Sequence, residues 1–249
     1  MVSSFIVYLD FSPNLRFFLK EGKNGKTIRK RLRHATTVKD VVESCGVPHT
    51  EIGLILVNGR AVDFNYHMFP EDRVTVGDVD PEAAEGFGLQ PMPGKRAAFI
   101  ADEHLSKLVR RLRVLGIDTL LFSGGQDQEL LFAMQRFDRI LLTRDRRLLM
   151  HRIVRSGYCI RSDNAVQQVY EVIGRFALAG SINPFSRCPS CNGLLEKVDK
   201  QLLMNQLEPK TQRYYCDFLR CVSCRKIYWH GSHAEKLGAF VADVVKRFG

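Results

Sequence analysis

The sequence predicts an α/β fold class, in which a parallel sheet with flanking helices follows a small β domain and precedes a cysteine-rich module. Three observations carry this prediction. Between residues 96 and 184, short apolar runs alternate with helical patterns, which is typical of a parallel sheet. Residues 1–80 favour strands around one short helix. After residue 187, two C-x-x-C pairs indicate a metal site.

The first domain is predicted from its strand and turn signals. Thr37 caps a short helix, and Asp40 follows three residues later as a variant of the capping box. Asn58-Gly59 separates two apolar runs and predicts a type I′ hairpin, because both residues tolerate positive φ. We therefore expect a β-grasp domain over residues 1–80 and a Pro- and Gly-rich linker over 81–95. The expected strands are Phe5–Phe11, 26–33, 53–57, 60–62 and Arg73–Val76.

This stretch resembles the ubiquitin-like sulfur carriers of thiamine and molybdopterin synthesis. The resemblance lies in V-K-D-V-V, L-I-L-V-N-G-R-A-V and E-D-R-V-T-V. Those carriers work through a free Gly-Gly tail, whereas this chain continues through Gly77-Asp78-Val79. The sulfur chemistry is therefore not carried over. We expect a docking or RNA-contacting module, and a purely structural role is at least as well supported.

The α/β domain, expected over 96–184, places acids after its strands. Asp102 follows strand Ala98–Ala101, and Asp145 follows the buried run Ile140–Leu142. Glu129 opens a helix after the second strand, and Asp163 follows the fourth strand. Because ligands bind outside the carboxyl ends of strands in open α/β sheets, these acids predict a cation site. Each could instead cap a helix or suit its macrodipole.

The other elements of this domain follow from periodicity. The first helix has Leu105, Leu108 and Leu112 on its apolar side, and its basic residues Lys107, Arg110, Arg111 and Arg113 are expected on the other side. The remaining predictions are a strand at 118–122, a helix at 127–137, a helix at 146–154, a strand at 158–161 and a helix after Asn164.

Two segments, F-I-A-D-E-H-L-S-K-L-V-R-R-L-R-V-L-G-I-D-T and R-I-L-L-T-R-D-R-R-L-L, resemble the PIN-like ribonuclease domain of the Mut-seven C-terminal family. The resemblance covers about residues 97–248, and a ubiquitin-like module often precedes this domain. It implies a catalytic set of Asp102, Glu129, Asp145 and Asp163, with Asp127 as an alternative to Glu129. It further implies RNA phosphodiester hydrolysis with Mg²⁺ or Mn²⁺. Candidates for binding the nucleic-acid backbone are Arg110, Arg111, Arg144, Arg146 and Arg147, although a solvated basic face explains any one of them.

The strongest single motif is the pair of knuckles formed by Cys188 with Cys191 and Cys221 with Cys224. Two such turns present four thiolates to one tetrahedral ion, which predicts structural Zn²⁺ in a zinc ribbon over 185–231. The lesser candidate ligands are Cys216, His230 and His233, which could instead be a packed thiol and surface imidazoles. The aromatic and basic residues between the knuckles could stack on unpaired bases or form the core of the ribbon. Residues 232–249 are expected to form a helix that packs back on the nuclease domain.

Charge and composition limit the classes of partner that the protein is expected to bind. The chain has a formal net charge of +10, and residues 1–90 hold 11 Lys and Arg against 12 Asp and Glu. A polyanion is therefore expected at the last two thirds of the chain, unless the basic surface serves only solubility. No apolar run approaches a membrane span, and the N-terminus reads as a strand and not a signal peptide, so we expect a cytoplasmic protein with no membrane partner.

Three functional hypotheses follow. The first is a metal-dependent ribonuclease whose partner is RNA, with tRNA and other structured RNAs among the candidates. The second is a non-catalytic RNA-binding or regulatory protein that uses the ribbon and the basic face. The third is a ubiquitin-like scaffold that recruits a protein partner through residues 1–80. The sequence does not separate RNA from DNA, or endonuclease from exonuclease action.

Overall fold

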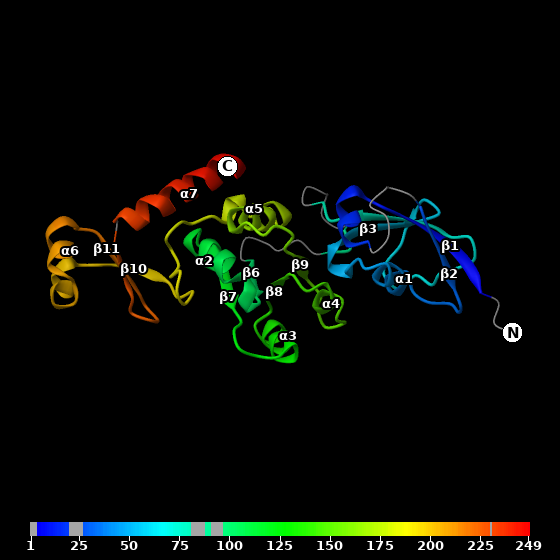
Figure 1. Cartoon of the computed structure of the whole chain (residues 1–249), viewed down its shortest axis with the longest axis horizontal. Coiled ribbons are helices and arrows are strands. Elements are labelled where there is room, and N and C mark those ends of the chain that lie inside the picture. The colour runs from blue at the N-terminus through cyan, green and yellow to red at the C-terminus, as the bar shows by residue number, and fades with distance from the viewer. Residues whose placement is uncertain (1–3, 20–26, 81–87, 91–96, 230) are drawn as a thin grey trace. The chain divides into compact units, whose positions relative to one another are not determined.

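The computed structural model describes residues 4–19, 27–80, 88–90, 97–229 and 231–249 (Figure 1). The chain divides into two compact units, and each is described by itself. One unit comprises Met1–Met92 with Asp127–Ile160, and the other comprises Pro93–Gln126 with Arg161–Gly249. Most of the predicted linker lies outside the described residues. Within it, Leu89 donates from its backbone N–H to the carbonyl of Gly53, so residues 88–90 join the first unit.

The N-terminal module is a β-grasp domain, as predicted. Its five-stranded sheet has the order β2-β1-β5-β3-β4, with β1 and β5 parallel and the other pairs antiparallel. Asn58 and Gly59 have φ of 51° and 79°, which confirms the predicted hairpin turn. The elements are β1 (Phe5–Phe11), η1 (Pro13–Phe18), β2 (Ile28–Leu32), α1 (Val38–Ser44), η2 (His49–Glu51), β3 (Ile52–Val57), β4 (Arg60–Ala61) and β5 (Arg73–Asp78).

Helix α1 covers one face of this sheet. Thr37 caps the helix by accepting the Asp40 N–H at 3.2 Å, as predicted. Val38, Val41 and Val42 are buried on the helix, and Val7 and Leu9 are buried on β1. Because side chains alternate along a strand, the residues between Val7 and Leu9 face the other side of the sheet.

The α/β domain contains a four-stranded sheet in the order β7-β6-β8-β9, and the pairs β6 with β7 and β8 with β9 are parallel. All four residues of β8 are buried, as expected for a central strand. The elements are β6 (Ala98–Ala101), η3 (Glu103–Leu105), α2 (Ser106–Val114), β7 (Asp118–Leu121), α3 (Asp127–Arg136), β8 (Ile140–Thr143), α4 (Arg146–Leu149), β9 (Gly157–Cys159), α5 (Ala165–Arg175) and η4 (Ala179–Ser181).

Two sequence expectations for this domain are wrong. Helix α4 ends at Leu149 and not at residue 154, because the chain turns at His151, whose ring accepts the backbone N–H of Ile153. Arg113 does not lie on the exposed basic side of α2. It is 6% exposed, because its guanidinium bonds to backbone carbonyls inside the second unit.

The ribbon contains a three-stranded antiparallel sheet in the order β10-β11-β12. A small core of Leu203, Leu207 and Phe218 supports it, and Tyr215 packs against that core. Phe218 is therefore a core residue, and Tyr215 is a partly buried residue that packs against the core. The elements are β10 (Leu195–Val198), η5 (Lys200–Gln206), α6 (Pro209–Tyr214), β11 (Phe218–Cys221), β12 (Ile227–Trp229) and the C-terminal α7 (Ser232–Phe248).

Helix α7 runs beside α5 in the second unit (Figure 1). The Tyr170 hydroxyl of α5 bonds to the Asp243 carboxylate of α7, and the Arg247 guanidinium lies 4.6 Å from the Tyr170 ring centroid. Phe240 lies against Arg111 of α2, 5.8 Å from guanidinium carbon to ring centroid. Helix α7 thus packs against helices α5 and α2. None of the helices in the described ranges combines the length and apolar character that crossing a membrane requires.

Candidate functional site

The structure brings the four predicted cysteines together. All four Sγ atoms of Cys188, Cys191, Cys221 and Cys224 lie within 4.8 Å of one another. The sulfurs of Cys188 and Cys224 are 3.7 Å apart, and those of Cys191 and Cys221 are 3.4 Å apart. A tetrahedral centre with Zn–S bonds of about 2.3 Å would place its sulfurs about 3.8 Å apart. The donor set and spacing therefore fit one tetrahedrally bound ion.

Each knuckle is shaped by its own backbone. Asn192 donates its N–H to the carbonyl of Cys188, and Arg225 does the same to Cys221. Both donors have positive φ, 73° for Asn192 and 62° for Arg225, so the two turns repeat one geometry. Gly193 lies where the knuckles meet, because a Cβ there would be 2.9 Å from Ser223 Cβ and 3.0 Å from Cys221 Sγ. The close approach of the knuckles thus requires glycine at this position.

The surroundings of the cluster act on two thiols in opposite directions. Burial raises the pKa of Cys188, but hydrogen bonds from the Tyr228 hydroxyl and from the backbone of Cys191 and Ser190 outweigh burial and lower that pKa to about 7. Burial raises the pKa of Cys191 to about 12. Since the thiolate is the form that binds metal, Cys188 is the better prepared of these two ligands.

A polar network joins the first knuckle to α2 and β7. Arg113 donates from Nε to the Thr119 carbonyl at 2.8 Å and from Nη1 to the carbonyls of Pro189 and Ser190 at 3.2 and 2.9 Å. Asn192 donates from Nδ2 to Asp118 at 2.8 Å. The sequence does not reveal this network, and its one signal is a basic residue, Arg113, next to the apolar face of α2.

Asp145 lies directly after β8, at the start of α4. Its Oδ1 accepts the backbone N–H of Arg147 at 2.7 Å and that of Leu148 at 3.3 Å. The Thr143 hydroxyl accepts the Asp145 N–H at 3.0 Å, which fixes the turn from the other side. Asp145 is therefore the helix cap that the sequence allowed as an alternative. Both capping bonds end on one oxygen, so capping does not use the whole carboxylate.

Asp102 has the same local arrangement after β6. Its Oδ1 accepts the backbone N–H of His104 at 3.0 Å, so it caps η3. Glu129 is exposed in the first turn of α3, together with the alternative Asp127. These placements agree with both the capping reading and the catalytic reading of the acids.

Asp163 is exposed and is not the cap of α5. The N-cap is Asn164, whose Oδ1 accepts the N–H groups of Val166 and Gln167. The carboxylate of Glu171 accepts the N–H groups of Arg161 and Ser162 and so fixes the turn before Asp163. Asp102 and Asp163 belong to one compact unit, and Glu129 and Asp145 belong to the other. A joint site of the four acids therefore stays a prediction.

The candidate RNA-binding arginines differ in their surroundings. Arg144 and Arg147 are exposed, whereas Arg146 donates to the carbonyls of Phe18 and Phe17 at 3.2 and 3.3 Å. Arg146 also lies over the Phe17 ring, 4.7 Å from its centroid. Arg146 thus connects the start of α4 to η1 of the β-grasp module, a contact that the sequence did not reveal.

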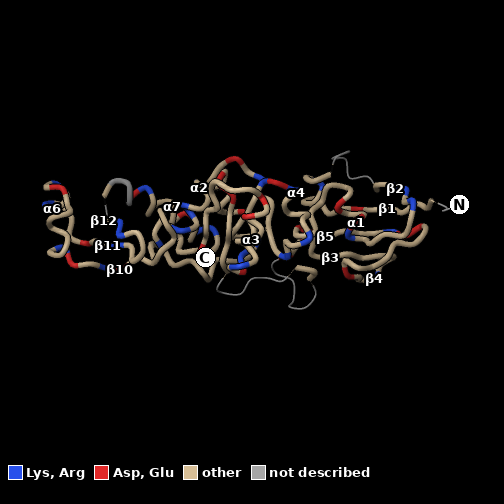
Figure 2. The backbone as a smooth tube through the Cα atoms, turned by 90° about the horizontal axis from the view of Figure 1, so that it is seen from below, with Lys and Arg blue, Asp and Glu red and all other residues tan. Residues whose placement is uncertain are grey.

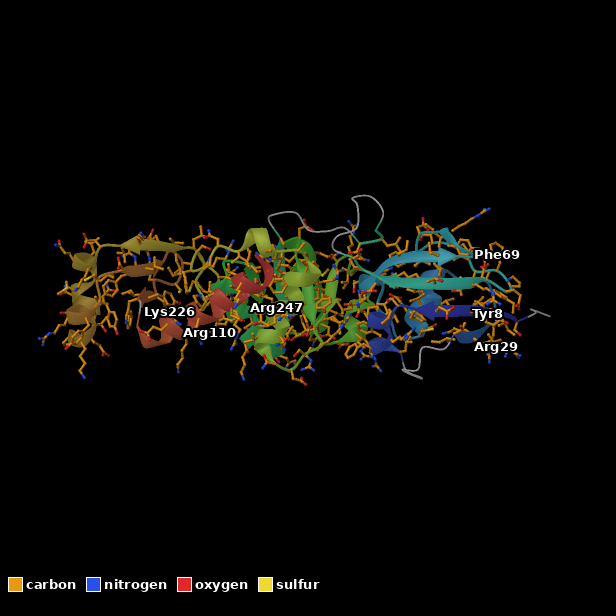
Figure 3. The ribbon with its side chains drawn as sticks, turned by 90° about the horizontal axis from the view of Figure 1, so that it is seen from above. Tyr8, Arg29, Phe69, Arg110, Lys226 and Arg247 are labelled. Atoms are coloured by element: carbon orange, nitrogen blue, oxygen red, sulfur yellow. The ribbon has the colours of Figure 1, made fainter. Side chains whose placement is uncertain are left out.

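In the other unit, Arg110 is exposed, and Arg111 lies over Phe240. Arg110, which Figure 3 labels, lines a cavity of about 610 Å³ together with Tyr228, Trp229 and Leu237. The cavity places one candidate phosphate contact beside exposed aromatic surface of the ribbon.

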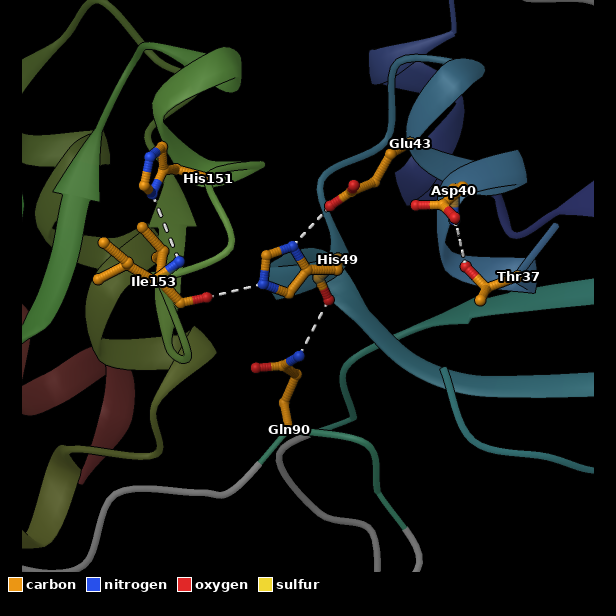
Figure 4. A network of polar contacts seen from close by, with 8 residues as sticks. Thr37, Asp40, Glu43, His49, Gln90, His151 and Ile153 are labelled. Carbon is orange, nitrogen blue, oxygen red and sulfur yellow. Dashed lines mark hydrogen bonds and ion pairs between the residues drawn. The ribbon is translucent and has the colours of Figure 1, made fainter. Parts of the chain in front are cut away.

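His49 makes a second contact between the β-grasp module and the α/β segment of the same unit (Figure 4). Its Nδ1 lies 2.7 Å from Glu43 Oε1, and its Nε2 lies 2.7 Å from the carbonyl of Val154. Gln90 donates to the His49 carbonyl at 2.9 Å. His49 is 6% exposed, so the ring is a buried link between α1 and the segment after α4.

Two family models match the chain. The Mut7-C RNAse domain matches residues 97–241, and the Mut7-C ubiquitin domain matches residues 4–83. No curated protein and no solved structure matches the chain. The first match covers more than half of the sequence and confirms the resemblance given above. The chain therefore belongs to the Mut7-C RNAse domain family and carries the ubiquitin-like domain of that family.

Proposed function

We propose that this protein is a metal-dependent ribonuclease that hydrolyses RNA phosphodiester bonds. The observation that carries the proposal is the ribonuclease-family match over residues 97–241. Within that match, Asp102 and Asp145 each directly follow a strand of the parallel sheet. The carboxyl ends of such strands are where open α/β sheets bind their ligands.

We assign the catalytic roles to Asp102, Glu129, Asp145 and Asp163, with Asp127 as the alternative to Glu129. Their donor set consists of carboxylate oxygens, which suits Mg²⁺ or Mn²⁺. When bound, such an ion activates a water and neutralises charge on the phosphate. Asp102 and Asp145 would hold it, because backbone N–H groups orient both carboxylates. Glu129 and Asp163 would complete the site or orient the attacking water.

Electrostatics favours a cation among grouped carboxylates. Two carboxylates about 4 Å apart repel by roughly 4 kcal/mol at an effective dielectric constant of 20. Protonation or a bound cation relieves such repulsion. Arg110, Arg111, Arg144 and Arg147 would contact RNA phosphates, and Arg146 would do so only if its guanidinium left the Phe17 and Phe18 carbonyls.

The rest of the chain supports this activity in the proposal. Zn²⁺ is assigned to the four cysteines, where a complete set of thiolates leaves no open position for catalysis. The proposed domains are 1–80, 96–184, 185–231 and the helix 232–249, with 81–95 as the linker. RNA, including tRNA and other structured RNA, is the proposed substrate class, a protein partner for residues 1–80 remains an alternative, and a cytoplasmic location stays a prediction.

The test is a cleavage assay on labelled single-stranded RNA, structured RNA and single-stranded DNA with Mg²⁺, Mn²⁺ or EDTA. The wild type is compared with Asp102→Asn, which keeps an amide oxygen to cap η3 but removes the charge. We expect cleavage only with a divalent ion, and a loss of at least about a hundredfold in the variant. Wild-type protein that binds RNA but never cuts it would favour the non-catalytic alternative, and cleavage that survives Asp102→Asn would contradict the assigned site.

A further inference from the structure

The β-grasp sheet has a face that the proposed ribonuclease function does not use. On the helix side, Lys30 of β2 bonds to the Ser44 hydroxyl of α1. On the other side, Arg29 and Arg31 of β2 are exposed, as is Arg73 of β5, and Tyr8 of β1 is half-buried. We call this second side the outer face.

Strand register aligns three of these side chains. Tyr8 lies opposite Arg29 on one neighbouring strand and opposite Arg73 on the other. Directly opposite residues on one face have Cβ atoms about 5 Å apart. Arg29, Tyr8 and Arg73 therefore form a row across three adjacent strands, and Arg31 stands opposite Ile6 in the next row. Figure 3 labels Tyr8 and Arg29 on this sheet.

The row contains a preformed stack. The Arg73 guanidinium carbon lies 5.1 Å from the centroid of the Tyr8 ring, within the range of a cation–π contact. A tyrosine ring and a guanidinium plane are two surfaces on which unpaired RNA bases stack. Because the guanidinium lies over the ring, the pair offers one stacking surface, the outer plane of Arg73, which the Tyr8 ring supports from below.

The charge of this face is opposite in sign to that of its segment. Residues 1–90 carry one more acid than base, so charge balance alone places a polyanion at the rest of the chain. On β1, β2 and β5, however, strand alternation places Arg29, Arg31 and Arg73 on the outer face against Asp10 alone. Figure 2 marks the basic and acidic residues along the backbone. The Asp10 carboxylate accepts a hydrogen bond from the Thr27 hydroxyl at 2.8 Å. The outer face of these three strands therefore has an excess of positive charge that the segment as a whole lacks.

We infer that the outer face binds single-stranded RNA. A base stacks on the guanidinium plane of Arg73, which the Tyr8 ring supports, and Arg29 and Arg31 contact phosphates. The choice of RNA as the ligand rests on the proposed ribonuclease function. The structural support is the positive charge of the outer face, which complements phosphates, and its stacking surface. In this role the module delivers substrate to the nuclease domain instead of recruiting a protein.

The test measures binding of a fluorescent single-stranded RNA to the full chain in EDTA, by anisotropy over a range of salt concentrations. Tyr8→Ala is compared with Tyr8→Phe, which keeps the ring. Arg29→Ala is compared with Lys39→Ala, which removes the same charge from α1 on the other side of the sheet. We expect Tyr8→Ala to weaken binding about tenfold and Tyr8→Phe to change it less than about twofold. Arg29→Ala should reduce the salt slope by about 0.7, and Lys39→Ala should leave it unchanged.

Binding in EDTA separates this inference from the proposed function. Unchanged affinity and salt slope in Tyr8→Ala and Arg29→Ala would overturn the inference even if the protein cleaves RNA, and would leave the outer face to a protein partner. Binding that depends on both residues would support the inference even if no metal gives cleavage. If Tyr8→Ala fails to fold by circular dichroism, the pair Arg29→Ala and Lys39→Ala decides, because Arg29 is exposed.

Discussion

The cysteines and the acids are two sets of candidate metal ligands that the chain assembles in different ways. The cysteines come from two four-residue C-x-x-C turns, and their sulfurs lie within 4.8 Å of one another. The acids come from four separate connections of the α/β domain, two in each compact unit. A metal site built from short turns is visible in both the spacing and the structure, whereas a site built from distant strands depends on how those strands are arranged.

The local bonds of the acids explain why they are harder to assign. A residue between the end of a strand and the start of a helix can cap the helix. The same position also suits a catalytic carboxylate. Asp102 and Asp145 each cap a helix through Oδ1. Capping and metal binding therefore occupy the same positions, and only a change that removes charge but keeps the cap separates them.

The largest expected effect is on the cysteine site. Cys221→Ser should abolish metal binding and unfold the ribbon, because structural zinc sites supply about 10–16 kcal/mol of apparent binding free energy. Elemental analysis should show about one zinc per chain in the wild type and none in the variant. Cys216→Ser is the matched control, since this thiol is exposed and lies outside the cluster. Zinc retained in Cys221→Ser would contradict the assignment of the metal to the four cysteines, because binding would then not require both knuckles.

A second prediction asks whether the cysteine site depends on the α/β domain. Arg113→Ala leaves the carbonyls of Thr119, Pro189 and Ser190 without this donor, so we expect a loss of about 3 kcal/mol in the free energy of unfolding by urea denaturation. Arg110→Ala, from an exposed position one turn earlier on α2, should cost less than about 0.5 kcal/mol. Equal losses in the two variants would show that the buried network does not anchor the knuckle.

A third prediction concerns the segment that follows Asp145. His49→Ala removes the bonds to Glu43 and to the Val154 carbonyl, and should cost about 2 kcal/mol of unfolding free energy. His34→Ala at an exposed position should have no measurable effect. If the His49 variant were as stable as the wild type, the ring would not be a structural link between α1 and this segment.

The smallest expected change in stability distinguishes the roles of Arg146 and Arg147, two neighbouring arginines that follow Asp145. Arg146→Ala should lower stability by about 1 kcal/mol, because its guanidinium bonds to the carbonyls of Phe17 and Phe18. Arg147→Ala should leave stability unchanged and reduce the salt slope of RNA binding by about 0.7. Reversed results, with Arg147 stabilising and Arg146 setting the salt slope, would contradict both assignments.

Much of the architecture follows from local sequence signals. Asn58-Gly59 predicts a hairpin that the positive φ values confirm, and Thr37 predicts a cap that the structure contains. The C-x-x-C spacing predicts a cluster that the sulfur distances bear out. These signals succeed because a few adjacent residues determine the geometry.

The features that sequence reasoning missed are long-range. Arg113 bonds to residues 76 and 77 positions later, and His49 bonds to a carbonyl 105 positions later. The row of Arg29, Tyr8 and Arg73 exists only because β1 pairs with both β2 and β5. The net charge of a segment does not depend on which strands pair. A segment whose net charge is close to zero can therefore contain a sheet face that is basic.

The most direct test of the ribonuclease proposal compares Asp145→Asn with Asp199→Asn in metal-dependent RNA cleavage. Both carboxylates cap helices through Oδ1, Asp145 at α4 and Asp199 at η5, so the same change preserves both caps. We predict that Asp145→Asn loses at least about a hundredfold in cleavage rate and keeps its RNA affinity, while Asp199→Asn cleaves like the wild type. Equal activity of the two variants would contradict the account, because Asp145 would then be only a helix cap.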